Sequence, residues 1–156
     1  MKPFTAGSLA VLVALVSAGS ALAHHSIANF DTTKAIRAKG VVLKFHKINP
    51  HSFIYVEEKT ADGRVRRWAA EGPGVLQLNR RGIGDDYLKP GDEIEICGYP
   101  HKENVVWQIA VTDPERRATS ISGRLLETEV IVLADGREEI WSNYGVGLCL
   151  GRGQSK

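Results

Sequence analysis

The chain has few of the residues from which common catalytic and metal centres are built. Its only methionine is Met1, and the two cysteines among its 156 residues, Cys97 and Cys149, are far apart in the sequence. A methionine-rich copper site and a Cys-x-x-Cys motif are therefore excluded. The sequence also lacks His-Glu-x-x-His and a glycine-rich phosphate loop that opens a helix. Its formal net charge is only +2, so we expect no nucleic-acid partner.

The first 23 residues have the parts of a secretory signal. Lys2 gives a short positive region, Leu9 to Val16 form an apolar core, and the segment ends in Ala-Leu-Ala at Ala23. The apolar core is shorter than the ~20 residues that a bilayer requires, which disfavours the alternative of an uncleaved anchor. We therefore expect cleavage after Ala23, a periplasmic or secreted protein, and no membrane span after signal cleavage.

The two cysteines, Cys97 and Cys149, allow one disulfide bridge in an oxidising compartment. The alternative is two unrelated thiols, with Cys97 packed inside a strand. The sequence alone leaves both open, because a bridge requires Cα atoms within about 7 Å of each other.

Period-2 alternation and turn residues dominate the chain after the leader. The expected strands are 40–48, 52–59, 65–71, 93–99 and 104–112, with a short helix over 75–81. An Asp-Gly turn at residues 61–64 joins the second and third strands. This order, with the helix between strands three and four, predicts an all-β, OB-like five-stranded barrel.

We expect three segments in the chain. Residues 1–23 are the signal peptide, residues 24–113 the OB-like domain, and residues 114–156 a β-hairpin extension with a flexible tail. A second Asp-Gly turn at residues 134–137 supports the hairpin, since residues 61–68 and 134–141 share the pattern ADGRxxxW. Chance similarity between two hairpins is the alternative to a true repeat.

Histidines are the main candidates for a binding site. Cleavage after Ala23 makes His24 the new N-terminus, where its α-amine and ring nitrogen chelate one ion and the ring of His25 lies nearby. His51 follows Asn49-Pro50 in a loop that fixes its backbone. We predict a metal site from His24, His25 and His51, with copper as the favoured ion. A flexible polar terminus and a turn histidine that only forms hydrogen bonds are the alternatives.

Other side chains are weaker candidates. His46 and His101 are secondary ligand candidates, and Glu71 is a candidate oxygen ligand. Trp68 alternates with Arg67 on a predicted strand, so we expect it to face the core. Cys97 lies in an apolar alternating strand, which is the expected place for a packed thiol and not for an activated nucleophile. We therefore expect no enzymatic activity.

Several short motifs together resemble a bacterial exported family called domain of unknown function 6152, over about residues 1–113. The resemblance implies an exported small β-rich domain and brings no established activity. The residues that carry it are the leader, His24-His25-Ser26, Phe30-Asp31, Gly40, Val42, Asn49-Pro50-His51-Ser52, Ala61-Asp62-Gly63, Trp68, Glu71-Gly72, Leu78, Arg80-Arg81-Gly82 and Leu88-Lys89-Pro90-Gly91-Asp92.

The sequence thus predicts a small exported binding protein, with a transition metal such as copper as its ligand. A structural or interaction module that binds an envelope protein or a small molecule is the alternative of a different class. Copper binding by a protein with a free His24 terminus distinguishes the two.

Overall fold

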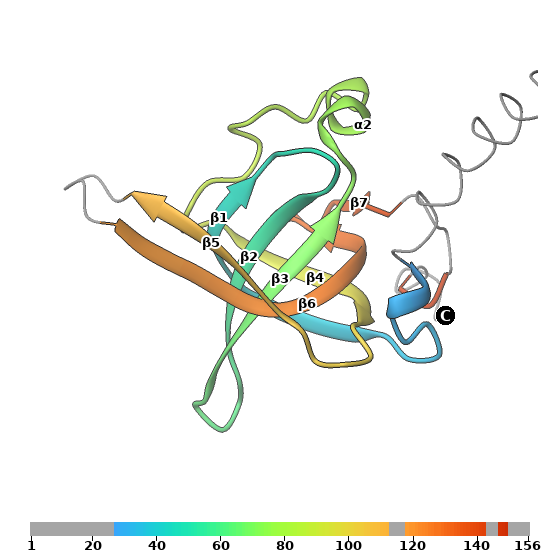
Figure 1. The fold of residues 1–156 in the computed structure, drawn as a ribbon, viewed down its shortest axis with the longest axis vertical. Coiled ribbons are helices and arrows are strands. Elements are labelled where there is room, and N and C mark those ends of the chain that lie inside the picture. Colours follow the sequence, from blue (N-terminus) through green and yellow to red (C-terminus); the bar gives the residue numbers. More distant parts are fainter. Residues whose placement is uncertain (1–26, 113–117, 143–146, 150–156) are drawn as a thin grey trace, which may run out of the picture.

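The computed structural model describes residues 27–112, 118–142 and 147–149, and Figure 1 shows its fold. One short α-helix and one 3-10 turn accompany seven strands in these residues. The elements are η2 (Ile27–Asn29), β1 (Ile36–His46), β2 (Ser52–Lys59), β3 (Val65–Gly72), α2 (Val75–Arg80), β4 (Glu93–Pro100), β5 (Val106–Thr112), β6 (Ala118–Val132) and β7 (Glu138–Ile140).

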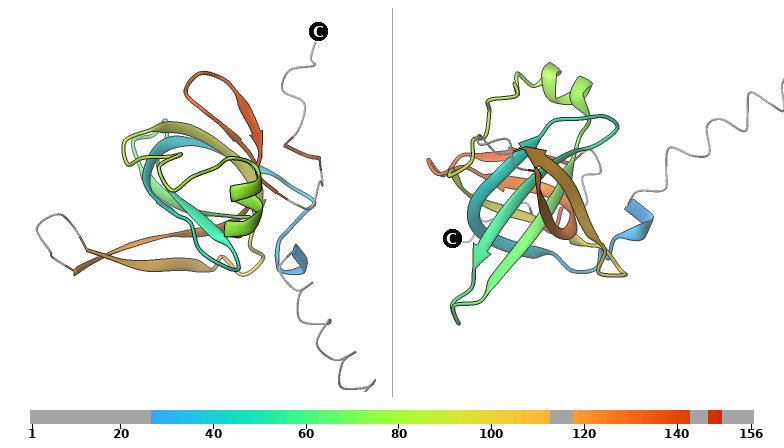
Figure 2. Two further views of the ribbon diagram at one scale, coloured as in Figure 1. Left: turned by 90° about the horizontal axis from the view of Figure 1, so that it is seen from above. Right: turned by 60° about the vertical axis from the view of Figure 1, so that its left-hand side comes forward.

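Five strands form a closed ring, which the two views of Figure 2 show from above and from the side. β1 pairs with β2 and β4, β3 pairs with β2 and β6, and β4 also pairs with β6. The β3–β6 pair is parallel and the other four are antiparallel. α2 lies between the third and fourth strands in chain order, so the predicted all-β, OB-like fold with one short helix is confirmed.

The fifth strand of the ring differs from the one we expected. The segment predicted at 104–112 forms β5, which pairs in the sheet with β6 and lies outside the ring. In Figure 1, β5 and the first half of β6 extend from the ring as a two-stranded arm. The predicted C-terminal hairpin is formed by β6 and β7, but β6 also closes the ring. Residues 124–132 of β6, which pair with β3 and β4, are therefore part of the ring.

Glycine allows β6 to close the ring at the point where it meets β3. A Cβ atom at Gly123 would lie 2.4 Å from the backbone carbonyl carbon of Trp68. Any other residue there would push the two strands apart. The pairing of Trp68 with Arg124 in the register of β3 and β6 begins at this contact.

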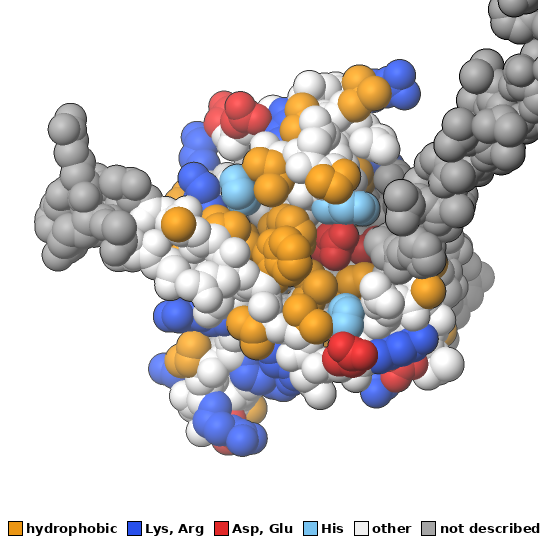
Figure 3. Space-filling view, viewed as in Figure 1, with side chains coloured by type: hydrophobic (Ala, Val, Ile, Leu, Met, Phe, Trp, Pro, Cys, Tyr) orange, Lys and Arg blue, Asp and Glu red, His pale blue; other side chains and the backbone are white. Residues whose placement is uncertain are grey.

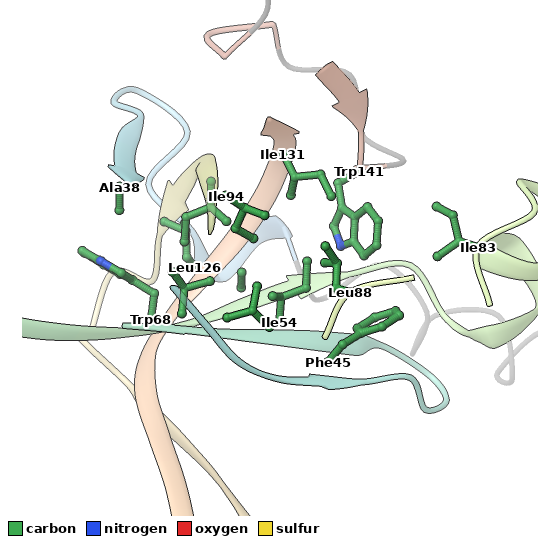
Figure 4. Close-up of a cluster of buried hydrophobic side chains, with 14 of the residues drawn as sticks. Ala38, Phe45, Ile54, Trp68, Ile83, Leu88, Ile94, Leu126, Ile131 and Trp141 are labelled. Carbon is green, nitrogen blue, oxygen red and sulfur yellow. The ribbon is translucent and has the colours of Figure 1, made fainter. Parts of the chain in front are cut away.

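The main core lies inside the ring and is shown in Figure 4. Trp68 and Trp141 lie toward opposite sides of this cluster, and both are fully buried. The inward position predicted for Trp68 is therefore confirmed, and its indole Nε1 also donates a 2.9 Å hydrogen bond to Glu58. Arg67 on the same strand is exposed, as the alternation requires.

A disulfide joins Cys97 and Cys149, with Cα atoms 5.7 Å apart. The bridge that the sequence left open is thus present. The buried carboxylate of Glu129 on β6 holds the segment near the bridge, since it accepts hydrogen bonds from the Tyr99 hydroxyl at 2.7 Å and the Cys149 backbone N–H at 2.9 Å.

The leader, His24 and His25 lie outside the described residues. Within the part of the chain that is described, no helix combines the length and apolar character needed to cross a membrane.

Candidate functional site

The loop between β1 and β2 is fixed to the rest of the fold by its own side chains. The Asn49 side-chain oxygen accepts a 3.0 Å hydrogen bond from the backbone N–H of Val75, the first residue of α2. Pro50 follows a cis peptide bond, and the Ser52 hydroxyl bonds the backbone of Ile48. The hydrogen bonds of Asn49 and Ser52, on either side of His51, therefore hold this loop in place.

The ring of His51 meets a carboxylate on the neighbouring strand. Its Nδ1 atom lies 3.1 Å from Oε1 of Glu71, and the side chain of His51 is 36% exposed while that of Glu71 is 9% exposed. Burial raises the pKa of Glu71, and the nearby His51 partly opposes this shift. The pair thus combines a solvent-accessible imidazole with a carboxylate that is largely removed from water.

A second carboxylate lies beside this pair. Glu127 on β6 is the register partner of Glu71 in the parallel β3–β6 pair. It is 3% exposed, and its Oε2 atom has no hydrogen-bond partner among the described residues. Burial, with a smaller contribution from the charge of Glu71, raises the pKa of Glu127 to about 8. Glu127 and His51 both line a small hollow of about 40 Å³.

His51 and Glu71 also border a larger hollow of about 440 Å³. Its walls are mostly apolar and aromatic, from Phe30, Ile48, Phe53, Val105, Trp107 and Leu125. Figure 3 shows this face, with orange apolar side chains gathered at its centre and pale-blue histidine and red acidic side chains next to them. The volume falls in the range of small-molecule sites.

Two aromatic side chains make a flat surface in this hollow. The ring of Trp107 on β5 stacks on that of Phe53 on β2, with centroids 5.4 Å apart and planes 16° from parallel. Trp107 remains 43% exposed. A large apolar side chain that is both stacked and exposed is typical of a ligand-binding surface.

The structure describes only one of the three predicted metal ligands. His51 lies in the hollow, while His24 and His25 lie outside the described residues. Among the secondary candidates, Glu71 and His101 line the same hollow as His51 and His46 does not. Burial, and to a smaller extent Lys44, lowers the pKa of His46, and its Nδ1 atom is buried without a described partner.

Sequence reasoning missed two features of the site. Glu127 was assigned to a hairpin extension, so its position opposite Glu71 was not foreseen. The stacking of Trp107 on Phe53 depends on the position that β5 takes when it pairs with β6, which no local pattern encodes. One signal was available for Glu127, because Glu127, Thr128 and Glu129 interrupt the apolar residues between Leu125 and Val132.

The described residues do not form a complete metal site by themselves. No group of three or more histidine, cysteine, aspartate or glutamate side chains within them is arranged to hold an ion. His51 and Glu71 supply one nitrogen donor and one oxygen donor on a fixed scaffold. A metal site here requires further donors from residues beyond the described part of the chain.

The fold and the hollow define a small OB-like β domain with an aromatic cavity beside a histidine–carboxylate pair. The chain belongs to DUF6152, a family of unknown function that matches residues 11–108. The predicted family is therefore confirmed. The matched region contains His51 and Glu71 and ends before β6. No curated protein matches the chain in sequence.

Two solved structures of single-stranded DNA-binding proteins are similar to the chain. A mitochondrial protein from S. cerevisiae is 10% identical, with a TM-score of 0.40, and the match covers 65% of this chain and 94% of that one. A small protein from Streptomyces coelicolor is 13% identical, with a TM-score of 0.31 and coverages of 64% and 93%. These neighbours overturn our exclusion of nucleic acid as a partner, which we withdraw. The low TM-scores give no argument that this chain binds DNA.

Proposed function

We propose that this protein is an exported binding protein that holds a transition-metal ion, copper first, between its mature N-terminus and the ring of strands. The observation that carries the proposal is the His51–Glu71 pair, with its 3.1 Å contact, at the edge of an accessible hollow. This pair supplies the fixed half of the site, and His24 and His25 supply the other half.

Chain length supports this combination of donors. Asn29 and Phe30 line the same hollow as His51 and Glu71, and Ile27 packs against the aromatic cluster that includes Phe30. His24 is three residues before Ile27, so the chain between them spans at most about 10 Å. A terminal histidine is therefore tethered within reach of the hollow.

The donor chemistry supports copper. A free α-amine and the imidazoles of His24 and His51 are nitrogen ligands that Cu(II) prefers. Burial raises the pKa of Glu71 and so favours its neutral form. A cation bound beside it would favour the deprotonated carboxylate, so metal binding would release a proton from Glu71. A flexible terminus alone binds metals without selectivity, whereas a fixed histidine restricts the geometry.

Export is part of the proposal, since it frees the amine of His24. The leader supports it, and so does the Cys97–Cys149 disulfide, because such bridges persist in oxidising compartments. We propose a binding role without catalysis. Both cysteines are in the bridge, so neither supplies a thiolate nucleophile.

The test compares Cu(II) affinity at neutral pH, measured by competition with a chelator, among proteins with different termini. One protein begins at His24 with a free α-amine, and a second is the same chain with that amine acetylated, so that the amine can no longer bind a metal. We expect acetylation to weaken Cu(II) binding at least about tenfold, because the amine–imidazole chelate is lost.

Two histidine variants complete the test. His51→Ala should weaken binding in the protein that begins at His24, whereas His46→Ala, which does not line the hollow, should leave the affinity unchanged. Equal affinity of the parent, His51→Ala and the acetylated protein would contradict the proposal and favour the interaction module.

A further inference from the structure

A second hollow adjoins the aromatic one. Its lining is mostly polar and basic, whereas that of the aromatic hollow is mostly apolar. It measures about 330 Å³, and Lys34, Lys102 and Arg124 line it together with Asp31. His101 lines both hollows. The His51–Glu71 end of the aromatic hollow borders the small cavity that contains Glu127, so the aromatic hollow has an acidic neighbour at one side and a basic neighbour at the other.

The basic hollow has more cations than its one carboxylate can balance. Lys34 pairs with Asp31 at 2.8 Å, and this bond together with that from Thr33 lowers the pKa of Asp31 to about 2. Lys102 donates to the backbone oxygen of Ala28 at 2.7 Å, which is a neutral partner. The net positive charge therefore favours an anionic group in this hollow.

Arg124 contributes a second cation with a neutral partner. Its guanidinium donates to the side-chain oxygen of Asn104 and lies over the ring of Trp68, 5.5 Å from the ring centroid. These contacts hold the guanidinium in one place without neutralising it. An arginine that is already positioned loses little side-chain entropy when it binds a carboxylate.

His101 provides a hydrogen-bond donor where the two hollows meet. Its Nδ1 atom accepts a 3.1 Å hydrogen bond from the backbone N–H of Glu103, so the proton of the neutral ring is on Nε2. The ring lies edge-on to Phe30, with centroids 5.3 Å apart. This contact fixes the orientation of the donor beside the aromatic wall.

We propose that the two adjoining hollows form a binding site for a small planar aromatic acid. Its ring packs against Phe53, Trp107 and Phe30, and its carboxylate lies near His101 Nε2, Lys102 and Arg124. A neutral aromatic molecule would leave the cations without a partner. An aromatic cation would meet the excess positive charge and be disfavoured.

The test uses three naphthalene probes that differ in charge and share one ring system. They are naphthalene-2-carboxylate, naphthalene-2-carboxamide and 2-naphthylmethylammonium, titrated by calorimetry and NMR into the full chain in the presence of EDTA. We expect the carboxylate to bind at least about tenfold more tightly than the amide, the difference expected for one partly desolvated charge contact. The ammonium should bind most weakly.

The three indole N–H signals locate the probe. The signal of Trp107 should shift on titration, while those of the buried Trp68 and Trp141 remain in place. Trp107→Ala should weaken carboxylate binding about tenfold through lost stacking, and Trp107→Leu, which keeps apolar volume, should weaken it less. Val106→Ala on the same strand is the matched control, because Val106 is exposed and lines neither hollow.

Charge variants test the basic hollow. Lys102→Gln should reduce the preference for the carboxylate over the amide about threefold, and Lys89→Gln, which changes an exposed lysine elsewhere, should not. Equal binding of carboxylate and amide, or an unshifted Trp107 signal, would overturn the proposal. Displacement of the carboxylate by micromolar oligothymidylate would also overturn it and assign this surface to single-stranded nucleic acid. EDTA keeps the outcome independent of the metal site.

Discussion

Glu71 on β3 and Glu127 on β6 are direct neighbours in the parallel pair that closes the ring, and both are buried. His51 is the partner of Glu71, whereas Oε2 of Glu127 has none among the described residues. The pKa of Glu127 is raised to about 8, mainly by burial. Closure of the ring thus brings two carboxyl groups side by side, and the raised pKa of Glu127 favours its protonated form at neutral pH.

Stability should fall as the pH rises because of this group. The pKa of Glu127 is about 8 in the folded protein and has an ordinary value of 4.5. Between these values the folded state binds the proton and the unfolded state does not, so the stabilisation is complete below pH 4.5 and is lost as the pH rises to about 8. Glu127→Gln keeps the neutral shape and removes the titration.

Urea unfolding at pH 5 and pH 8 measures this effect. We expect Glu127→Gln to be more stable than the parent at pH 8 by about 1–3 kcal/mol and to differ little at pH 5. Glu138→Gln is the control, because Glu138 is exposed on β7. The parent and Glu127→Gln could instead differ in free energy of unfolding by the same amount at both pH values. That result would show that Glu127 is already ionised in the folded protein at pH 5.

Trp68 should be among the most costly side chains to truncate. It is 1% exposed inside the ring, so Trp68→Ala should lower the free energy of unfolding by ~3–5 kcal/mol. Val65→Ala on the same strand removes an exposed side chain and should change it by less than about 0.5 kcal/mol. Denaturant unfolding of both variants checks this, and a cost below about 1 kcal/mol for Trp68→Ala would contradict the core position.

The disulfide should contribute to stability through the unfolded state. Its cysteines are 52 residues apart, for which the chain-entropy model gives about 4 kcal/mol, with smaller values common in practice. Replacing both Cys97 and Cys149 by alanine should lower the free energy of unfolding by up to about 4 kcal/mol. Thiol titration of the unfolded, unreduced protein should find no free thiol, and detection of two would refute the bridge.

Cleavage between Ala23 and His24 is a separate prediction, because the small-residue pattern follows the apolar core. Intact-mass measurement of the protein from its native host should give the mass of residues 24–156. A mass that includes residues 1–23 would contradict the prediction. It would mean that His24 has no free amine, so the terminal chelate could not form.

Local patterns predicted much of the fold. The strand expected at 52–59 is observed with the same bounds as β2, because alternation and the Asp-Gly turn are local signals. Gly63 in that turn has a φ of 81°, which glycine adopts without strain. The turn also sets the hairpin register, in which Phe53 is opposite Glu71. Because His51 is two residues before Phe53, this register brings His51 near Glu71.

Non-local pairing was not predicted, since a strand pattern does not name its partner. The sequences of β5 and β6 both fit a strand, and neither shows which of them closes the ring. The missing side chain of Gly123 permits the close approach of β6 to Trp68. The apolar hollow depends on the same choice, because Trp107 reaches Phe53 only when β5 lies outside the ring. These parts of the site follow from tertiary packing.

We propose that the mature N-terminus and the folded loop of His51 share one copper ion. The EPR spectrum of the protein that begins at His24, with one equivalent of Cu(II), tests it most directly against His51→Ala. Because loss of an imidazole nitrogen changes the ligand field, we predict different g and hyperfine values for the two proteins. Identical spectra, with His51→Ala folded by circular dichroism, would show that His51 does not bind the ion.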